Sequence, residues 1–342
     1  MNRKSFINIA LPGCLALGLN ISLPTWARNN TAETSSMVPP NLNAGDIIGI
    51  TSPAGYISLE DVQPAVKQLE KWGYKVEIGQ TIGKKHGTFG GTDFERMSDF
   101  QYMLDNDTIK AVLCARGGYG MVRIIDKLNF SKFSASPKWL IGFSDITTLH
   151  SHLFAVTGIP SIHSKMCNSF PANPAVASQI QQETIESINF TLKGIKMKYN
   201  APFHPSNKQG KGVGKLIGGN LRTLENMAGS NAQINTKNCI LFLEDTGEYP
   251  YSVDRMLWNL KRAGLFNQLQ GLIIGGFKNK LETEEDLFPL SLQQMVHEKI
   301  TEFEFPVCFD FPVGHQVNNF ALKCGVIHQL EVSENGTILV EI

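Results

Sequence analysis

The stretch LIGFSDITT, residues 140–148, passes directly from a strand-like apolar run into a helix-like segment. Ser144 stands at the corner between the two. A serine in such a corner exposes its hydroxyl beside the amides of a helix N-terminus, which is the geometry of an activated nucleophile. Serine is also a favoured residue at the start of any helix, so the corner alone leaves a purely structural role open.

The segments on both sides of this corner alternate between strand and helix. Strand-like apolar patterns at 46–50, 74–78 and 109–115 are separated by helical periodicity at 59–72 and 93–104. The third of these strands is continuously apolar, as expected when both faces are buried. This alternation of strands and helices predicts a parallel sheet covered by helices on both sides, with ligands at the carboxyl ends of its strands.

The second half of the chain is richer in strands, with patterns at 239–245, 272–277 and 307–311. A terminal hairpin is predicted over residues 326–342, where Asn335-Gly336 is a type I′ turn signal. The expected fold class is therefore α/β, with an N-terminal parallel-sheet domain and a strand-rich C-terminal domain.

The first 27 residues have the pattern of a secretory signal peptide. A basic start at residues 3–4 precedes a largely apolar run over 6–23, and residues 25–27 (Thr-Trp-Ala) offer a small-x-small cleavage site. A retained membrane anchor is the alternative, although proline and asparagine residues interrupt the apolar run. The expected location is periplasmic or secreted, with no membrane span after cleavage, and cytoplasmic if the signal is not functional.

Changes in composition divide the chain into five expected regions. They are a signal peptide (1–27), a flexible leader (28–43), an N-terminal α/β domain with the nucleophile (44–170), a linker (171–208) and a β-rich C-terminal domain with the other site residues (209–342).

Composition excludes several classes of function. Lys+Arg and Asp+Glu both number 31 in 342 residues, and no basic run or nucleic-acid-reading motif is present, so nucleic acid is not an expected partner. The six cysteines form no CxxC pair and no metal-ligand spacing, which indicates buried free thiols without a metal site. No nucleotide-binding motif occurs, and no cofactor is expected.

Other elements can complete a site around the serine. The glycines of RGGYG, residues 116–120, can bring bare N–H groups against a ligand. Glu244 ends a predicted strand, with Asp245 an equally good rival on spacing alone. His315 follows a predicted strand in a polar loop. The rival candidates for the base are His150, His152 and His163.

Taken together, these elements resemble the LD-carboxypeptidase family of serine peptidases. The resemblance covers residues 43–342, and it is the combination of motifs that is specific. The motifs are RGGYG at 116–120, GFSDIT at 142–147, GGNL at 218–221, LED at 243–245 followed by residues 251–257, and GH at 314–315.

The resemblance implies a role for each site residue. Ser144 would be the nucleophile, His315 the general base, and Glu244 the carboxylate that orients the imidazole. The backbone amides of Gly118 and Asp145 would form the oxyanion hole. The family places these groups at the junction of the two domains.

Three further residues are expected to bind substrate: Arg116, Gly117 and Asn220. Arg116 flanks the glycine turn and is a candidate for binding the terminal carboxylate that an exopeptidase must recognise. The family's usual substrate is a murein tetrapeptide, whose terminal D-Ala is released by hydrolysis of an L,D bond. The resemblance also implies a homodimer.

Two alternatives stay open. One is the self-immunity branch of the same family, which hydrolyses peptide-nucleotide antibiotics. The other is a non-catalytic periplasmic muropeptide-binding protein, which would not need all three candidate catalytic residues. Two departures from the family pattern bear on substrate choice: Ser164-Lys165 stands where Gly-Pro is expected, and Gly229-Ser230 where Gly-Thr is usual. The export signal departs from the cytoplasmic members that recycle murein.

Overall fold

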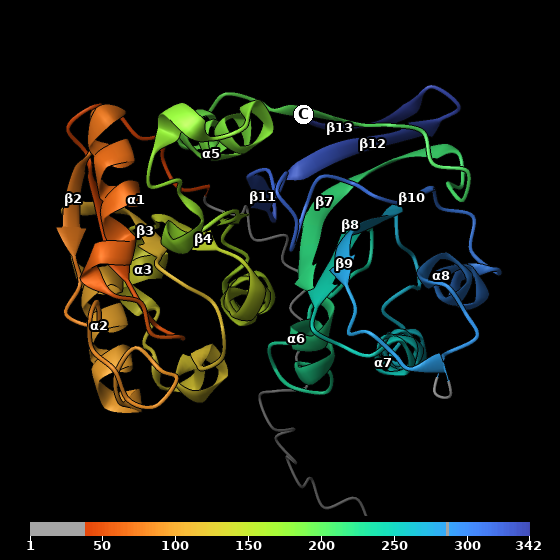
Figure 1. Cartoon of the computed structure of the whole chain (residues 1–342), viewed down its shortest axis with the longest axis horizontal. Coiled ribbons are helices and arrows are strands. Elements are labelled where there is room, and N and C mark those ends of the chain that lie inside the picture. The colour runs from red at the N-terminus through yellow and green to blue at the C-terminus, as the bar shows by residue number, and fades with distance from the viewer. Residues whose placement is uncertain (1–37, 285–286) are drawn as a thin grey trace, which may run out of the picture. The chain divides into compact units, whose positions relative to one another are not determined.

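The computed structural model describes residues 38–284 and 287–342. The predicted signal peptide, and the predicted leader up to residue 37, lie outside these ranges. Among the residues described, no helix combines the length and apolar content needed to cross a bilayer. The chain folds around two sheets, and Figure 1 labels most of their strands.

The first sheet has six strands, of which five are parallel and one is antiparallel to its neighbour. Its order is β11 (Leu322–Cys324), β5 (Ser161–His163), β4 (Trp139–Gly142), β3 (Ile109–Cys114), β1 (Ile47–Thr51) and β2 (Lys75–Ile78). The antiparallel strand is β11, which comes from near the end of the chain. The predicted parallel sheet of the N-terminal half is confirmed.

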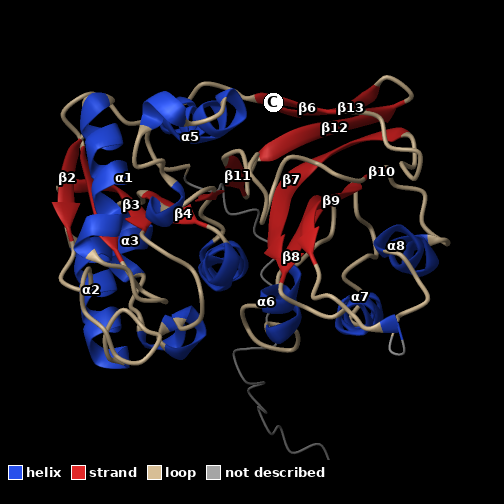
Figure 2. Cartoon of the chain, in the orientation of Figure 1, coloured by secondary structure: helices blue, strands red, loops and turns tan. Residues whose placement is uncertain are grey.

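Helices cover both faces of this sheet (Figure 2). One face packs against α1 (Leu59–Lys71) and α5 (Gln179–Leu192). The other packs against α2 (Asp93–Asp105), α3 (Ser131–Ala135) and α4 (Thr147–His152). Burial on both faces explains why β3 and β4 are almost continuously apolar.

The second sheet has seven strands and mixed direction. Its order is β10 (Val307–Cys308), β9 (Gly271–Lys278), β8 (Cys239–Thr246), β7 (Gly210–Asn220), β12 (Ile327–Ser333), β13 (Gly336–Glu341) and β6 (Lys198–Ala201). The first four are parallel, and the last three are joined by antiparallel pairing. The predicted α/β class with a strand-rich second half is confirmed.

Alternation along β8 decides what each face of the second sheet meets. Leu241 and Leu243 pack on the face covered by α6 (Leu221–Asn226), α7 (Pro250–Arg262) and α8 (Leu292–Ile300). On the opposite face, the ring of Phe242 contacts the ring of His163 in β5, with centroids 5.0 Å apart. That face therefore meets the first sheet, and the side chain of the residue two positions after Phe242 is directed to the junction.

The terminal hairpin forms as predicted, but its turn differs from the prediction. Ser333 pairs with Gly336, so the turn residues are Glu334 and Asn335, not Asn335 and Gly336. Neither turn residue has a positive φ, whereas Gly336 has a φ of +116°. The glycine is therefore the first residue of β13, directly after the turn. The cysteines of the described residues are buried and unbridged, as predicted.

A buried arginine connects α2 to two loops at the carboxyl edge of the first sheet. The Arg96 side chain has no exposed surface and donates to the carbonyl oxygens of Pro53 at 2.5 Å and Gly120 at 2.8 Å. It also pairs with Asp93. Because Gly120 ends the RGGYG segment, the hydrogen bond from Arg96 holds the end of that glycine turn in place.

Replacing this side chain should destabilise the protein strongly. We expect Arg96→Met to lower the free energy of unfolding by about 3 kcal/mol, because two buried carbonyls lose their donor. As a control, Lys84→Met removes an exposed ion pair to Glu95 of the same helix and should cost less than about 1 kcal/mol. Urea denaturation measures both, and equal losses would contradict the role given to Arg96.

Candidate active site

Ser144 lies at the corner between β4 and a single 3₁₀ turn, Ser144–Ile146, that leads into α4. Its φ is +63°, in the left-handed region that costs a non-glycine residue about 1–2 kcal/mol. A strained strand-to-helix corner of this kind exposes the nucleophilic hydroxyl in hydrolases. The predicted corner is thus present, together with backbone strain that the sequence pattern did not indicate.

The RGGYG turn lies directly against this serine. A Cβ added to Gly117 would be 3.2 Å from Oγ of Ser144, closer than ordinary contact. Gly118 has a φ of +95°. Within the described part of the chain, neither the N–H of Gly118 nor that of Asp145 is bonded to a protein acceptor. Both can therefore donate to a further group, which is what the predicted oxyanion hole requires.

The side chain of Asp145 holds the turn and the serine corner together. Its Oδ2 accepts a hydrogen bond of 2.8 Å from the backbone N–H of Met121, just after the RGGYG segment. The carboxyl is buried, and this burial raises its pKa to about 6. The side chain of Asp145 thus accepts a hydrogen bond from the protein, while its backbone N–H donates to no acceptor among the described residues.

Glu244 and His315 are in direct contact. Nδ1 of His315 donates to Oε2 of Glu244 at 2.5 Å, and the carboxylate is fully buried while the imidazole is 18% exposed. A carboxylate on Nδ1 fixes the tautomer whose Nε2 can accept a proton. Spacing had left Asp245 as an equal rival, but its carboxylate accepts from Asn220 and from the N–H of Arg222.

The loop before His315 is built to reach this carboxylate. Gly314 has a φ of +99°, and a Cβ there would be 2.3 Å from Cβ of Glu244, so only glycine fits. The N–H of Gly314 donates to Oδ1 of Asn319 at 2.7 Å, and this oxygen also lies 3.1 Å from Nε2 of His163 in β5. The loop of the second sheet is thereby tied to a strand of the first.

This arrangement brings the serine corner and the imidazole together. The ring of Phe143, the residue before Ser144, lies 5.0 Å from the ring of His315 between centroids. No hydrogen bond joins the Ser144 hydroxyl to His315 among the described residues. Such bonds in hydrolases often tighten only when substrate binds.

The rival histidines all have structural partners. The ring nitrogens of His150 contact Oγ of Ser161 and the carbonyl oxygen of Gly142, and burial lowers its pKa to about 4. The ring of His152 lies against Phe130, with centroids 5.1 Å apart. His163 contacts Asn319, as described above. Of these histidines and His315, only His315 contacts a buried carboxylate.

Two of the residues expected to bind substrate are engaged with the protein. Nη1 of the exposed Arg116 donates to the carbonyl oxygen of Tyr56 at 2.8 Å. The buried Asn220 caps α6, since its Oδ1 accepts from the N–H of Thr223, and its Nδ2 donates to Asp245. Roles for Arg116, Gly117 and Asn220 in substrate binding stay predictions.

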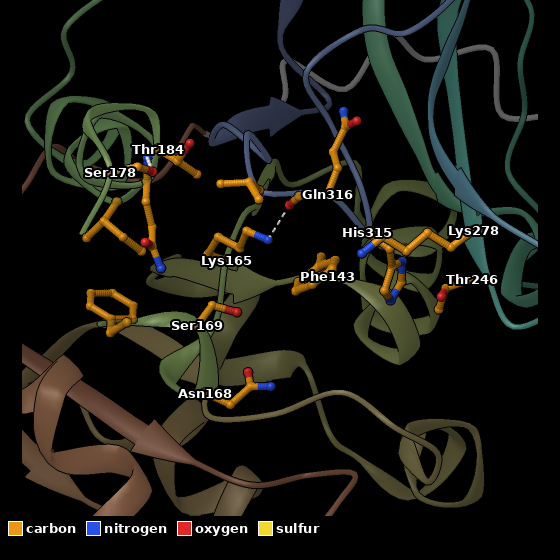
Figure 3. Close-up of a pocket in the computed structure, with 14 residues that line it drawn as sticks. Phe143, Lys165, Asn168, Ser169, Ser178, Thr184, Thr246, Lys278, His315 and Gln316 are labelled. Atoms are coloured by element: carbon orange, nitrogen blue, oxygen red, sulfur yellow. Dashed lines mark hydrogen bonds between the residues drawn. The ribbon is translucent and has the colours of Figure 1, made fainter. Parts of the chain in front are cut away.

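A cavity of about 540 Å³ opens beside His315 (Figure 3). Phe143 and two lysines, Lys165 and Lys278, line it together with residues of α5. The α5 contribution was not predicted, because the polar residues of that helix have the spacing of an ordinary solvent-facing surface. In the described ranges, no cluster of His, Cys, Asp and Glu side chains is arranged to hold a metal ion.

Comparison with known proteins places the chain in a family. Residues 48–164 match the LD-carboxypeptidase N-terminal domain and residues 213–330 match the LD-carboxypeptidase C-terminal domain. The chain belongs to the LD-carboxypeptidase family. It is 32% identical over 308 residues to a probable murein peptide carboxypeptidase of Bacillus subtilis, covering 88% of this chain and 93% of that protein.

Two other members of the family are informative. The crystal structure of muramoyltetrapeptide carboxypeptidase from Oxalobacter formigenes has a TM-score of 0.75 and 28% identity, covering 86% of this chain and 98% of that one. The microcin C7 self-immunity protein MccF of Escherichia coli is 27% identical over 330 residues, with 86% of this chain and 93% of that protein covered. Proteins similar to this chain are thus named both as carboxypeptidases and as a self-immunity protein.

The neighbouring carboxylates Glu244 and Asp245 allow a matched test of the histidine contact. Glu244→Gln keeps the side-chain size but removes the charge that stabilises the imidazolium, so we expect kcat to fall about 10,000-fold. Asp245→Asn changes an equally buried neighbour that does not contact His315 and should cost less than about 10-fold. The measurement is the rate of hydrolysis of a muropeptide, and the reverse order would assign the role to Asp245.

Proposed function

We propose that this protein is a serine carboxypeptidase that hydrolyses the L,D peptide bond and releases terminal D-Ala from murein tetrapeptides. The observation that carries the proposal is the strained Ser144 corner beside a histidine held by a buried carboxylate. Membership of the LD-carboxypeptidase family and a relative named as a murein peptide carboxypeptidase support the substrate class.

In the proposed reaction, Nε2 of His315 takes the proton from the Ser144 hydroxyl as Oγ attacks the carbonyl carbon of the scissile bond. Glu244 stabilises the imidazolium that forms. The amides of Gly118 and Asp145 donate to the oxyanion, an effect of about 3 kcal/mol for each donor.

The second half of the reaction uses the same groups. The imidazolium of His315 gives its proton to the nitrogen of the departing D-Ala, which leaves an acyl ester on Ser144. Water, activated by the neutral imidazole, then attacks this ester and restores the free serine. Arg116 is the proposed partner of the terminal carboxylate.

The proposal also covers where the protein acts and how its domains and subunits are organised. A signal peptide over residues 1–27 would export the protein, so the substrate would be met in the periplasm or outside the cell. The leader, the two domains and the linker would follow the boundaries expected from the sequence, and the active form would be a homodimer. Strand β11, from near the end of the chain, pairs with β5 of the first sheet and supports a fixed junction between the two halves.

The second candidate within the family is hydrolysis of a peptide-nucleotide antibiotic, which the similarity to MccF supports. Such a substrate needs an aromatic surface on which the base can stack. The aromatic side chains that line the cavity, Phe143 and Phe170, are the residues to be tested for that role. Direct comparison of a murein tetrapeptide with an aminoacyl sulfamoyl nucleoside as substrates separates the two activities.

Replacing the nucleophile tests catalysis against simple binding. We expect Ser144→Ala to lower D-Ala release from a murein tetrapeptide at least about 10,000-fold, because the substitution removes the hydroxyl that attacks the scissile carbonyl. The affinity for the tetrapeptide, measured by calorimetry, should change little. A non-catalytic binding protein would release no D-Ala before or after the substitution, and that result would reject the proposal.

A further inference from the structure

One cation in the cavity has no assigned task in the proposed mechanism. Lys165 lies two residues after β5, at a position where the family pattern predicts proline. It lines the cavity that His315 also lines, and in Figure 3 its side chain lies between the α5 residues and Phe143. Its Nζ donates to the carbonyl oxygen of Gln316, the residue after His315, at 2.5 Å.

This ammonium group is not paired with a carboxylate. Within the described ranges, no Asp or Glu side chain forms an ion pair with Lys165. Its Nζ contacts the carbonyl oxygen of Gln316 and lies 5.6 Å from the centroid of the Phe143 ring. A partly buried charge without a counter-ion is costly, so such groups in proteins are normally paired. Of the three N–H donors on Nζ, one is directed to Gln316, which leaves donors for a further acceptor.

The surroundings of Lys165 favour an anion. Lys278 lines the same cavity, and Glu244, the carboxylate whose charge acts on Lys165, is already bonded to His315. Burial, and then the charge of Lys278, lower the pKa of Lys165 to about 8. A carboxylate placed in the cavity would relieve both the unpaired charge and the repulsion between the lysines.

We propose that Lys165 binds a carboxylate of the peptide substrate on the acyl side of the scissile bond and thereby determines specificity. This inference rests on the proposed function. The leaving group is a single alanine, whereas a cavity of about 540 Å³ is large enough for most of a drug-sized ligand. The space beside Lys165 therefore accommodates the acyl part of the peptide.

Two carboxylates occur on that side of a murein tetrapeptide. One is the α-carboxylate of the γ-linked second residue, and the other ends the side chain of a diaminopimelate at the third residue. Lys165 would bind either through the same charge-assisted hydrogen bond. A third residue ending only in an amine would instead be repelled by Lys165.

The experiment tests one substitution on three matched peptides. The peptides are a diaminopimelate tetrapeptide, the same peptide amidated at the third-residue side-chain carboxyl, and the same peptide amidated at the second-residue carboxyl. Wild-type protein is compared with Lys165→Met, and kcat and KM for D-Ala release are measured. We expect wild type to prefer the free acid over one amidated peptide by about 10- to 100-fold, and Lys165→Met to bring this ratio close to one.

A matched control separates this role from the loss of any buried lysine. Lys138 is also partly buried, burial lowers its pKa to about 8, and it donates to the carbonyl oxygens of Met103 and Asn106, with no part in the cavity lining. Lys138→Met should leave the wild-type preference between the peptides intact. The bound carboxylate is identified by the amidated peptide that wild type hydrolyses less well than the free acid and that Lys165→Met hydrolyses about equally well.

Two results would overturn the inference. If Lys165 only holds the His315 loop through Gln316, Lys165→Met lowers kcat by the same factor on all three peptides and the ratios persist. If wild type does not discriminate between acid and amide, no carboxylate is bound there. Should wild type release no D-Ala at all, the proposed function fails. Calorimetry of the three peptides on Ser144→Ala, with and without Lys165→Met, then still tests the carboxylate preference.

Discussion

The site depends on the hydrogen bond between the imidazole of His315 and the buried carboxylate of Glu244. The carboxylate is on a strand of the second sheet, on the face that meets the first sheet, and the imidazole comes from a loop that only a glycine allows to approach so closely. A buried carboxylate with a single strong partner holds that partner in one orientation. The position of the candidate base is therefore set by the core of the second sheet.

The candidate nucleophile comes from the other sheet, so the contacts across the junction decide whether the two can act together. These contacts include the side chains of Phe242 against His163, His163 with Asn319, and Lys165 with the carbonyl oxygen of Gln316. Strand β11 adds main-chain pairing between the end of the chain and β5. A displacement of about 1 Å at such a junction can cost about 100-fold in rate.

Much of the fold was accessible from local patterns, because the strands, helices and sheet direction follow from periodicity and burial. Alternation along β8 also places Glu244 on the same face as Phe242. Spacing alone did not decide between Glu244 and Asp245, and Glu244 was chosen only through the family resemblance. The link from His163 to Asn319 and the lining of the cavity by α5 could not be predicted. These depend on contacts between residues far apart in the sequence. The hairpin turn was misplaced by one residue, since a glycine after a turn and one within it give similar patterns.

Covalent labelling with a serine-directed fluorophosphonate, followed by peptide mapping by mass spectrometry, tests most directly whether Ser144 is a nucleophile activated by His315. Labelling should occur at Ser144, at a rate that falls sharply in His315→Ala, because the hydroxyl is nucleophilic only beside its base. Labelling at a different serine, or at Ser144 with a rate unchanged by His315→Ala, would contradict this role for the two residues.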